Sequence, residues 1–231
     1  MNDVALEFEN VTCGYGDTMV VRSMSGRVSQ GSVVAVVGRN GVGKTTLMKT
    51  LAGFLPVSGG SLRWRCADLA ALAPHERLKL GISYSPQENV VFGDLSVNDN
   101  LWLHLRERRG ERYEEMLREF PRLKERLAQA AGLLSGGERK LLAFARTMGL
   151  GACINLFDEP TEGVQPENID RMARLIRAHA EAGRSFLVVE QNLSFVEKIA
   201  DEVIVMDRGE AVVSGKMSDL GRATLERYLQ I

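Results

Sequence analysis

The chain has 231 residues, of which 45% are apolar and 26% charged, a balance typical of a globular protein with a sizeable core. Its formal net charge of -1 gives no electrostatic reason to expect nucleic acid or an anionic membrane as a partner. No stretch approaches the roughly 18 apolar residues that a membrane-spanning helix needs, and the first residues lack the basic-then-apolar pattern of a leader. If the protein works at a membrane, we expect another subunit to hold it there.

The chain contains three cysteines, Cys13, Cys66 and Cys153. Their number is odd, and none of them stands in a CxxC or other metal-ligand spacing, which argues against a disulfide framework or a zinc site. We interpret them as reduced cysteines of a cytosolic protein. Cys153 lies inside an apolar run, so we expect its side chain in the core.

The N-terminal residues predict strands. Val4, Leu6 and Phe8 alternate with polar residues, the period-two pattern of a half-buried strand. We expect a second strand over residues 26–29, before the turn at Gly31.

The middle of the chain alternates between apolar runs and helical sequence. The run 33–37 is continuously apolar and ends at Gly38, as expected of a buried parallel strand, and residues 45–55 predict the helix after it. Two more apolar runs, 154–157 and 186–189, each end in polar or acidic residues. Strands that alternate with helices predict an α/β fold with an open parallel sheet, which binds ligands at the carboxyl ends of its strands.

Two segments stand apart from this alternation. Residues 203–213 contain two apolar runs around a polar turn and predict a hairpin. Residues 106–126 are dense in charge, and the apolar residues in and just after them recur at helical spacing. We interpret this segment as a solvated helical insert with one buried stripe, formed by Tyr113, Leu117, Phe120, Leu123 and Leu127.

Residues 38–45 fit the phosphate-loop pattern GxxxxGK[ST]. The glycines let the backbone turn tightly so that its N–H groups face a phosphate chain, and the helix that follows adds the positive end of its dipole. Lys44 can reach the terminal phosphates, and the hydroxyl of Thr45 can ligate Mg²⁺. The alternative, a glycine-rich turn, is weakened by the strand before the loop and the helix after it. The expected nucleotide-binding residues here are Gly38, Arg39, Asn40, Gly41, Val42, Gly43, Lys44, Thr45 and Thr46.

The apolar run 154–157 ends in two carboxylates, Asp158 and Glu159. Acidic strand ends are common, so this pattern alone would indicate little. Together with a phosphate loop it favours a catalytic interpretation, in which Asp158 serves Mg²⁺ and Glu159 polarises the attacking water.

The segment Leu134-Ser135-Gly136-Gly137-Glu138 supports two interpretations at once. Ser135 with Glu138 three residues later forms a capping box before an apolar helix. Such a helix start also exposes N–H groups to a phosphate, and a cap alone would not require two glycines, which weaken a first turn.

With these three motifs in this order, the sequence resembles the ABC ATPase family over essentially its whole length. The resemblance implies a single phosphate-loop NTPase domain over residues 1–231, with a RecA-like parallel sheet core and an N-terminal antiparallel β subdomain. It implies a helical subdomain inserted at approximately 89–135. The cofactors would be ATP and Mg²⁺, and two cassettes would pair head to tail. Lys44 of one and Ser135 of the other would contact the same nucleotide.

The family pattern assigns further residues. Tyr15 matches the aromatic residue that stacks on adenine, although alone it would be an ordinary turn tyrosine. Gln87 matches the glutamine that senses Mg²⁺ and the permease, and residues 162–166 match a loop that contacts the other cassette.

Two positions depart from the family pattern. Glu138 stands where glutamine is commonest, and Gln191 stands where a histidine usually senses the γ-phosphate. Glutamine can donate a hydrogen bond to phosphate but cannot carry a charge. None of the histidines falls at that position, and we expect His75, His104 and His179 on the surface.

The details of the motifs resemble the shorter ATPase of hydrophobic (branched-chain) amino-acid importers, a family that includes urea and short-amide importers. The segments are GRNGVGKTT, SGGE, DEPTEGVQP and VEQN. This resemblance implies two permease subunits, a second cassette (identical or a longer paralogue) and, indirectly, an extracytoplasmic substrate-binding protein. It places the chain at the cytoplasmic face of the inner membrane, without nucleic acid.

Two alternatives stay open. An export or lipid-flipping cassette would carry every one of these catalytic motifs. A non-transport ABC protein acting on DNA or the ribosome is disfavoured, because such proteins usually insert long coiled coils or fuse two cassettes. Here Lys44 and Ser135 are too close in sequence for such an insertion, and the charge is near neutral.

Overall fold

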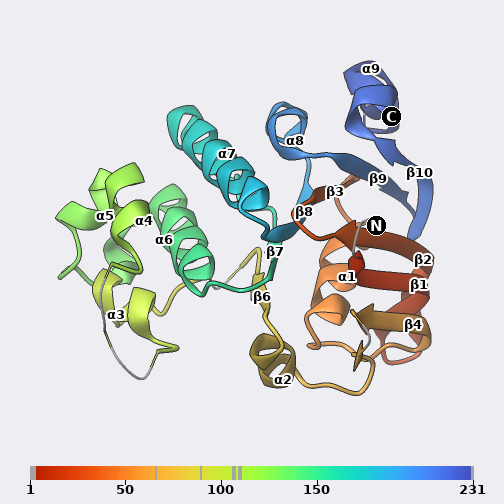
Figure 1. The fold of residues 1–231 in the computed structure, drawn as a ribbon, viewed down its shortest axis with the longest axis horizontal. Coiled ribbons are helices and arrows are strands. Elements are labelled where there is room, and N and C mark those ends of the chain that lie inside the picture. Colours follow the sequence, from red (N-terminus) through yellow and green to blue (C-terminus); the bar gives the residue numbers. More distant parts are fainter. Residues whose placement is uncertain (1–3, 66, 89, 106–107, 109–110, 230–231) are drawn as a thin grey trace.

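The computed structural model describes residues 4–65, 67–88, 90–105, 108 and 111–229. Within this part of the chain, two sheets share a hydrophobic core around helix α1 (Lys44–Leu51), and further helices cover the larger sheet on its other side (Figure 1). None of the described helices is long and apolar enough to cross a membrane.

The larger sheet has six strands in the order β10-β9-β3-β8-β7-β6. Its strands pair in parallel, except that β9 and β10 form an antiparallel hairpin. The three central strands β3, β7 and β8 are buried along their full length, which explains their continuous apolar sequences. The bounds are β3 Val33–Val37, β6 Ile82–Ser85, β7 Ile154–Asp158, β8 Ser185–Glu190, β9 Glu202–Asp207 and β10 Glu210–Lys216.

The smaller sheet is antiparallel, in the order β2-β1-β4-β5. Its strands are β1 Val4–Tyr15, β2 Thr18–Ser29, β4 Gly59–Trp64 and β5 Ala67–Asp68. The predicted second strand, 26–29, is the end of the much longer β2. Most of β2 was missed because its side chains are largely exposed and its register against β1 shifts repeatedly, which hides the period-two pattern.

Helices α6 and α7 cover the face of the large sheet that α1 leaves free (Figure 1). The rings of Phe144 on α6 and Phe157 on β7 stack at 5.1 Å, and Phe186 on β8 continues this row. The remaining helices are α2 Pro74–Lys79, α3 Val97–Trp102, α4 Glu114–Glu119, α5 Pro121–Glu125, α8 Leu193–Ile199 and α9 Met217–Leu229, with α6 at Gly136–Gly149 and α7 at Pro166–Glu181.

The predicted helical insert consists of short helices rather than one. Helices α3, α4 and α5 gather at the end of the molecule far from the antiparallel sheet (Figure 1). Pro121 separates α4 from α5, because proline cannot continue the helix that precedes it. Within the predicted stripe, Tyr113, Phe120 and Leu123 are buried, whereas Leu117 and Leu127 are half-buried.

Two further differences concern boundaries and cysteines. The helix predicted over 45–55 ends at Leu51, and residues 52–55 form a turn. The prediction of a buried Cys153 is wrong: its side chain is exposed, because it precedes the first residue of β7 and stands outside the sheet. Cys13 is buried, and Cys66 lies outside the described residues.

Candidate nucleotide site

The phosphate loop joins the end of β3 to the start of α1. Gly41 and Gly43 have φ values of 81° and 109°, in the left-handed region that glycine adopts without strain. The Lys44 side chain is buried, and its Nζ donates to the carbonyl oxygens of Gly38 at 2.8 Å and Arg39 at 2.9 Å. The ammonium group therefore lies across the loop, at the position where it can bind an anion held by the loop N–H groups.

Oxygen atoms from three segments meet beside the loop. The Oγ1 of Thr45 lies 3.2 Å from Oδ1 of Asp158 and 3.4 Å from Oε1 of Gln87. The hydroxyl of Tyr84 donates to the other oxygen of Asp158 at 3.2 Å. Burial raises the pKa of Asp158 to about 6, against hydrogen bonds from Thr45 and Tyr84 that lower it. A hydroxyl, an amide oxygen and a carboxylate are ligands that suit Mg²⁺.

Glu159 lies next to this group, at the end of β7. Its carboxylate accepts hydrogen bonds from Nε2 of Gln87 at 2.8 Å and Nε2 of Gln191 at 3.0 Å, and Oε1 is 3.4 Å from Nζ of Lys44. Its φ is 47°, a conformation that costs energy for a residue other than glycine, and its N–H is held by the carbonyl of Val189. The backbone therefore turns the carboxylate toward the phosphate loop.

Gln191 connects the two motifs. Its Nε2 donates to Oδ1 of Asn40 in the phosphate loop at 2.6 Å, as well as to Glu159. The structure thus brings together, at the carboxyl ends of β3, β7 and β8, the residues predicted from the phosphate loop, the acidic strand end and the switch position.

The segment that begins α6 forms the capping box expected from sequence. Ser135 Oγ accepts from the N–H of Glu138 at 3.3 Å, and Glu138 Oε2 accepts from the N–H of Ser135 at 3.0 Å. A Cβ on Gly137 would lie 2.5 Å from the carbonyl oxygen of Gly163, so the close approach of residues 162–166 requires glycine there. Nothing lies within 4 Å of a Cβ on Gly136, so packing does not explain that glycine.

This segment does not join the phosphate-loop cluster. Ser135, Gly136, Gly137 and Glu138 line a separate cavity of about 850 Å³, together with residues of α5, the loop 162–165 and the start of α7. None of the residues 38–46 lines it. One chain therefore presents the phosphate loop and the start of α6 on two separate surfaces.

Tyr15 stands at the end of β1 with its side chain 49% exposed. The antiparallel sheet borders the phosphate loop, because a Cβ on Gly43 would lie 3.2 Å from Cγ1 of Val20 on β2. The tyrosine ring is consequently accessible to a flat ligand at this edge.

Comparison with known families agrees with this geometry. The model of the ABC transporter family matches residues 21–162, which include all three motifs. The chain belongs to the ABC transporter family. It is the ATP-binding, ATP-hydrolysing subunit of a transporter, and such a subunit works with membrane permeases. The resemblance inferred from the motifs is confirmed.

Individual relatives match this cassette over nearly its full length. The branched-chain amino acid transport ATP-binding protein BraG of Pseudomonas aeruginosa is 33% identical, covering 95% of this chain and 94% of BraG. A probable branched-chain amino acid transport protein, LivF of Archaeoglobus fulgidus, is 32% identical, with 91% of each chain covered. The lipopolysaccharide export protein LptB of Escherichia coli is 30% identical, covering 93% and 92%.

Solved structures show the same fold. An ATP-binding subunit of an ABC transporter superposes with a TM-score of 0.82 at 25% identity, covering 94% of this cassette and 91% of that chain. A bacterial Atm1-family exporter with ATP bound gives 0.84 at 26% identity, covering 95% of this cassette and 40% of the longer exporter chain. The predicted α/β cassette fold, with an antiparallel and a mostly parallel sheet, is confirmed.

The geometry adds Lys140 to the site of this cassette, a residue that sequence reasoning missed. Lys140 lies in the second turn of α6, and its Nζ donates to the carbonyl oxygens of Gln87 at 2.8 Å and Glu159 at 3.0 Å. The only sequence signal is a lysine five residues after Ser135 near the start of an amphipathic helix, and that signal does not reveal its acceptors.

Glu190 is a second missed residue. It is 3% exposed, and its carboxylate accepts from the N–H and hydroxyl of Thr161 and from the N–H groups of Gln191 and Asn192. Burial raises the pKa of Glu190, against these four hydrogen bonds. Through these hydrogen bonds the carboxylate of Glu190 connects the turn after Glu159 with the turn that carries Gln191.

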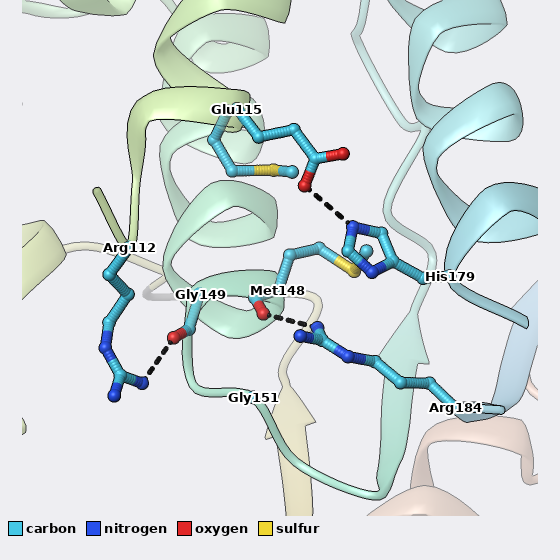
Figure 2. Close-up of a pocket in the computed structure, with 8 residues that line it drawn as sticks. Arg112, Glu115, Met148, Gly149, Gly151, His179 and Arg184 are labelled. Atoms are coloured by element: carbon cyan, nitrogen blue, oxygen red, sulfur yellow. Dashed lines mark hydrogen bonds and ion pairs between the residues drawn. The ribbon is translucent and has the colours of Figure 1, made fainter. Parts of the chain in front are cut away.

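A smaller cavity of about 360 Å³ lies at the opposite end of α6 from Ser135 (Figure 2). Arg112 and Arg184 donate to carbonyl oxygens of the last turn of α6, as cations at a helix C-terminus do. His179 Nε2 lies 2.9 Å from Glu115, which links α7 to α4. These contacts account for the charged lining of the cavity.

The prediction that all three histidines lie on the surface is wrong for two of them. His75 is exposed, but His179 is half-buried in the contact with Glu115, and His104 is half-buried beside Tyr113. Burial, together with nearby arginines, lowers the pKa of His104 to about 4. Packing within and against the helical segment explains both, and a lone histidine in a charged sequence gives no sign of it.

Proposed function

We propose that this cassette powers a membrane importer for branched-chain amino acids or for urea and short amides. The observation that carries the catalytic part is the convergence of Lys44, Glu159 and Gln191 beside the phosphate loop. Residues 38–46 bind the phosphates of ATP, and Glu159 accepts the proton of the attacking water. Gln191 orients Glu159 and senses the end of the phosphate chain through its amide.

Thr45, Gln87 and Asp158 would hold Mg²⁺, which offsets phosphate charge when bound. The hydroxyl of Thr45 already lies within hydrogen-bond distance of an oxygen of Gln87 and an oxygen of Asp158, so little rearrangement is needed to face one cation. Gln87 also bonds Glu159, so its position depends on both the cation site and the carboxylate.

Two cassettes would pair head to tail. The separation of the phosphate-loop cluster from the cavity at Ser135 supports this, because each surface alone offers half of a nucleotide site. Ser135, Gly136, Gly137 and Glu138 would then contact ATP held by the other cassette, whose adenine stacks on that cassette's own Tyr15.

We treat residues 1–231 as one ATPase domain, with a helical subdomain at approximately 89–135 that meets the permease. The two permeases, the second cassette and the indirect substrate-binding protein are the partners that this function requires. Attachment to permeases would place the cassette at the cytoplasmic face of the inner membrane.

Import of a hydrophobic amino acid or a small amide is favoured by the similarity to BraG and LivF. A second candidate, an export or lipid-flipping cassette, is supported by the similarity to LptB at 30% identity. The two candidates share every residue of the nucleotide site and differ in the permease.

The variant Glu159→Gln tests the catalytic assignment. It keeps the hydrogen bond from a neighbouring amide but removes the base, so we expect hydrolysis to fall at least a hundredfold while ATP still binds and accumulates in a stable cassette pair. Lys44→Ala is the control, which should lose ATP affinity instead. ATPase activity near the unmodified rate in Glu159→Gln, with the partner cassette present, would refute the role of Glu159.

The identity of the transported molecule is tested with the complete transporter, because the permeases and not the cassette contact that molecule. The complex that co-purifies with the cassette is reconstituted in vesicles, and ATP-driven uptake of branched-chain amino acids, urea and short amides is measured. ATP-dependent lipid movement without uptake of any of these would favour the export candidate.

A further inference from the structure

We propose that Arg126 is a positioning residue of the nucleotide site, where its guanidinium neutralises Glu138 so that the cavity at the start of α6 accepts a triphosphate. The inference rests on the proposed function, in which this cavity faces ATP held by the other cassette. It explains how a carboxylate can stand where the family commonly has a neutral glutamine.

The contact is direct. Nη1 of Arg126, at the C-terminal end of α5, lies 2.9 Å from Oε2 of Glu138, and both residues line the cavity of about 850 Å³. The side chains are 31% and 19% exposed, so solvent screens the pair only in part. The same Oε2 also accepts the N–H of Ser135, which fixes the carboxylate at the start of the helix.

An unpaired carboxylate at this position would oppose the function of the cavity. The first N–H groups of a helix have no acceptor within the helix and attract anions. The carboxylate of Glu138 already occupies this electropositive end and would repel a phosphate brought beside it. Glutamine at the same position could form the cap without this repulsion.

Protonation of Glu138 does not remove its repulsion of a phosphate. Burial disfavours the charge of Glu138, but hydrogen bonds from Ser135 and the positive charges of Arg126 and Arg122 hold the pKa of Glu138 below its usual range. The carboxylate is therefore ionised near neutral pH and needs a cation as its counterpart. Arg126 is the residue in contact with it.

The alternative is an ordinary ion pair, which would stabilise the fold slightly and leave nucleotide use unchanged. The two interpretations differ in one respect. If Arg126 serves to cancel the charge of Glu138, its loss should harm the site only while that charge is present.

The experiment measures steady-state ATP hydrolysis by the full chain in the complex with its permeases and second cassette. We expect Arg126→Ala to raise KM for ATP at least tenfold, with a smaller effect on kcat. Glu138→Gln provides the reference, and KM of the double variant Arg126→Ala/Glu138→Gln should return to within threefold of the KM of Glu138→Gln alone.

Arg174→Ala is the matched control. It removes a positive charge from helix α7, outside this cavity, where the arginine side chain is 67% exposed and pairs with Glu119. We expect a change in KM below twofold. Arg126→Gln, which keeps a polar side chain of similar length, provides a second test and should show the same loss and the same rescue.

The inference is overturned if Arg126→Ala and Arg126→Gln leave KM unchanged, or if adding Glu138→Gln restores neither. Thermal unfolding of each variant shows whether a loss of activity reflects a loss of fold. Failure of the proposed function looks different: the unmodified complex would not hydrolyse ATP, or Lys44→Ala would hydrolyse it at the unmodified rate.

Discussion

The carboxylate of Asp158 makes a quantitative prediction, because it is buried without a cation in direct contact among the described residues. The substitution Asp158→Asn removes the charge and keeps the shape. In the unmodified folded chain the pKa of the Asp158 carboxyl is about 6, against an ordinary value of 3.8. Each pKa unit of this difference corresponds to about 1.36 kcal/mol. At pH 7.5 the buried charge therefore costs about 3 kcal/mol relative to the unfolded chain.

Asp158→Asn removes this cost, but part of the stability gained is lost again because a hydrogen bond is not made. The asparagine amide can serve only one of the hydrogen bonds from Thr45 and Tyr84 in the present geometry, and an unmade hydrogen bond costs about 1–2 kcal/mol. We expect Asp158→Asn to be more stable than the unmodified chain by about 1–2 kcal/mol at pH 7.5 without nucleotide, and to lose ATPase activity. Stability is measured by urea unfolding.

The pH dependence gives the sharper test. The stability conferred by protonating Asp158 is complete below pH 3.8 and is lost as pH rises through about 6. The advantage of Asp158→Asn should therefore be near its full value at pH 7.5 and largely gone at pH 4.5. A variant that is less stable at pH 7.5, or whose advantage does not change with pH, would refute the electrostatic reasoning. Thr45→Val, which leaves the carboxylate charged, is the control and should show no such gain.

Two further predictions concern catalysis and packing. Gln191→Ala should lower kcat by roughly tenfold or more while ATP affinity, measured by calorimetry, changes less than threefold, because the contact of the amide with Glu159 acts on the attacking water, whereas Lys44 and the loop N–H groups hold the phosphates; equal losses in both would indicate a structural role only. Gly149→Ala should lower the free energy of unfolding by about 1–3 kcal/mol, since its Cβ would lie 2.0 Å from the buried ring of Tyr113. Gly136→Ala, with nothing within 4 Å, is the matched control; equal unfolding midpoints for the two variants would contradict the packing argument.

The sequence predicted the parts of the fold that depend on local pattern. Continuous apolar runs located β3, β7 and β8, because strands buried on both faces have no polar side to obscure them. It failed where exposure breaks the pattern, as in β2, and where proline divides a periodic segment, as at Pro121.

The site was predictable as motifs but not as contacts. Short-range patterns located the phosphate loop and the capping box at Ser135, whose geometry depends on neighbouring residues. Lys140 contacts Gln87, Glu190 contacts Thr161 and Arg126 contacts Glu138, and in each pair the two residues belong to different segments that only the folded chain brings together. Periodicity and spacing carry no information about such pairings.

The position of helix α6 would couple the two nucleotide sites of a pair of cassettes. It begins at the cavity beside Ser135, and Lys140, five residues later and about 7.5 Å along the axis, holds the carbonyls of Gln87 and Glu159. In a head-to-tail pair, one helix would therefore contact the nucleotide of the other cassette through its first turn and hold the backbone of its own Gln87 and Glu159 through its second turn. Two hydrolysis sites joined in this way would share their timing, since a shift of α6 at one would displace the water-activating carboxylate of the other.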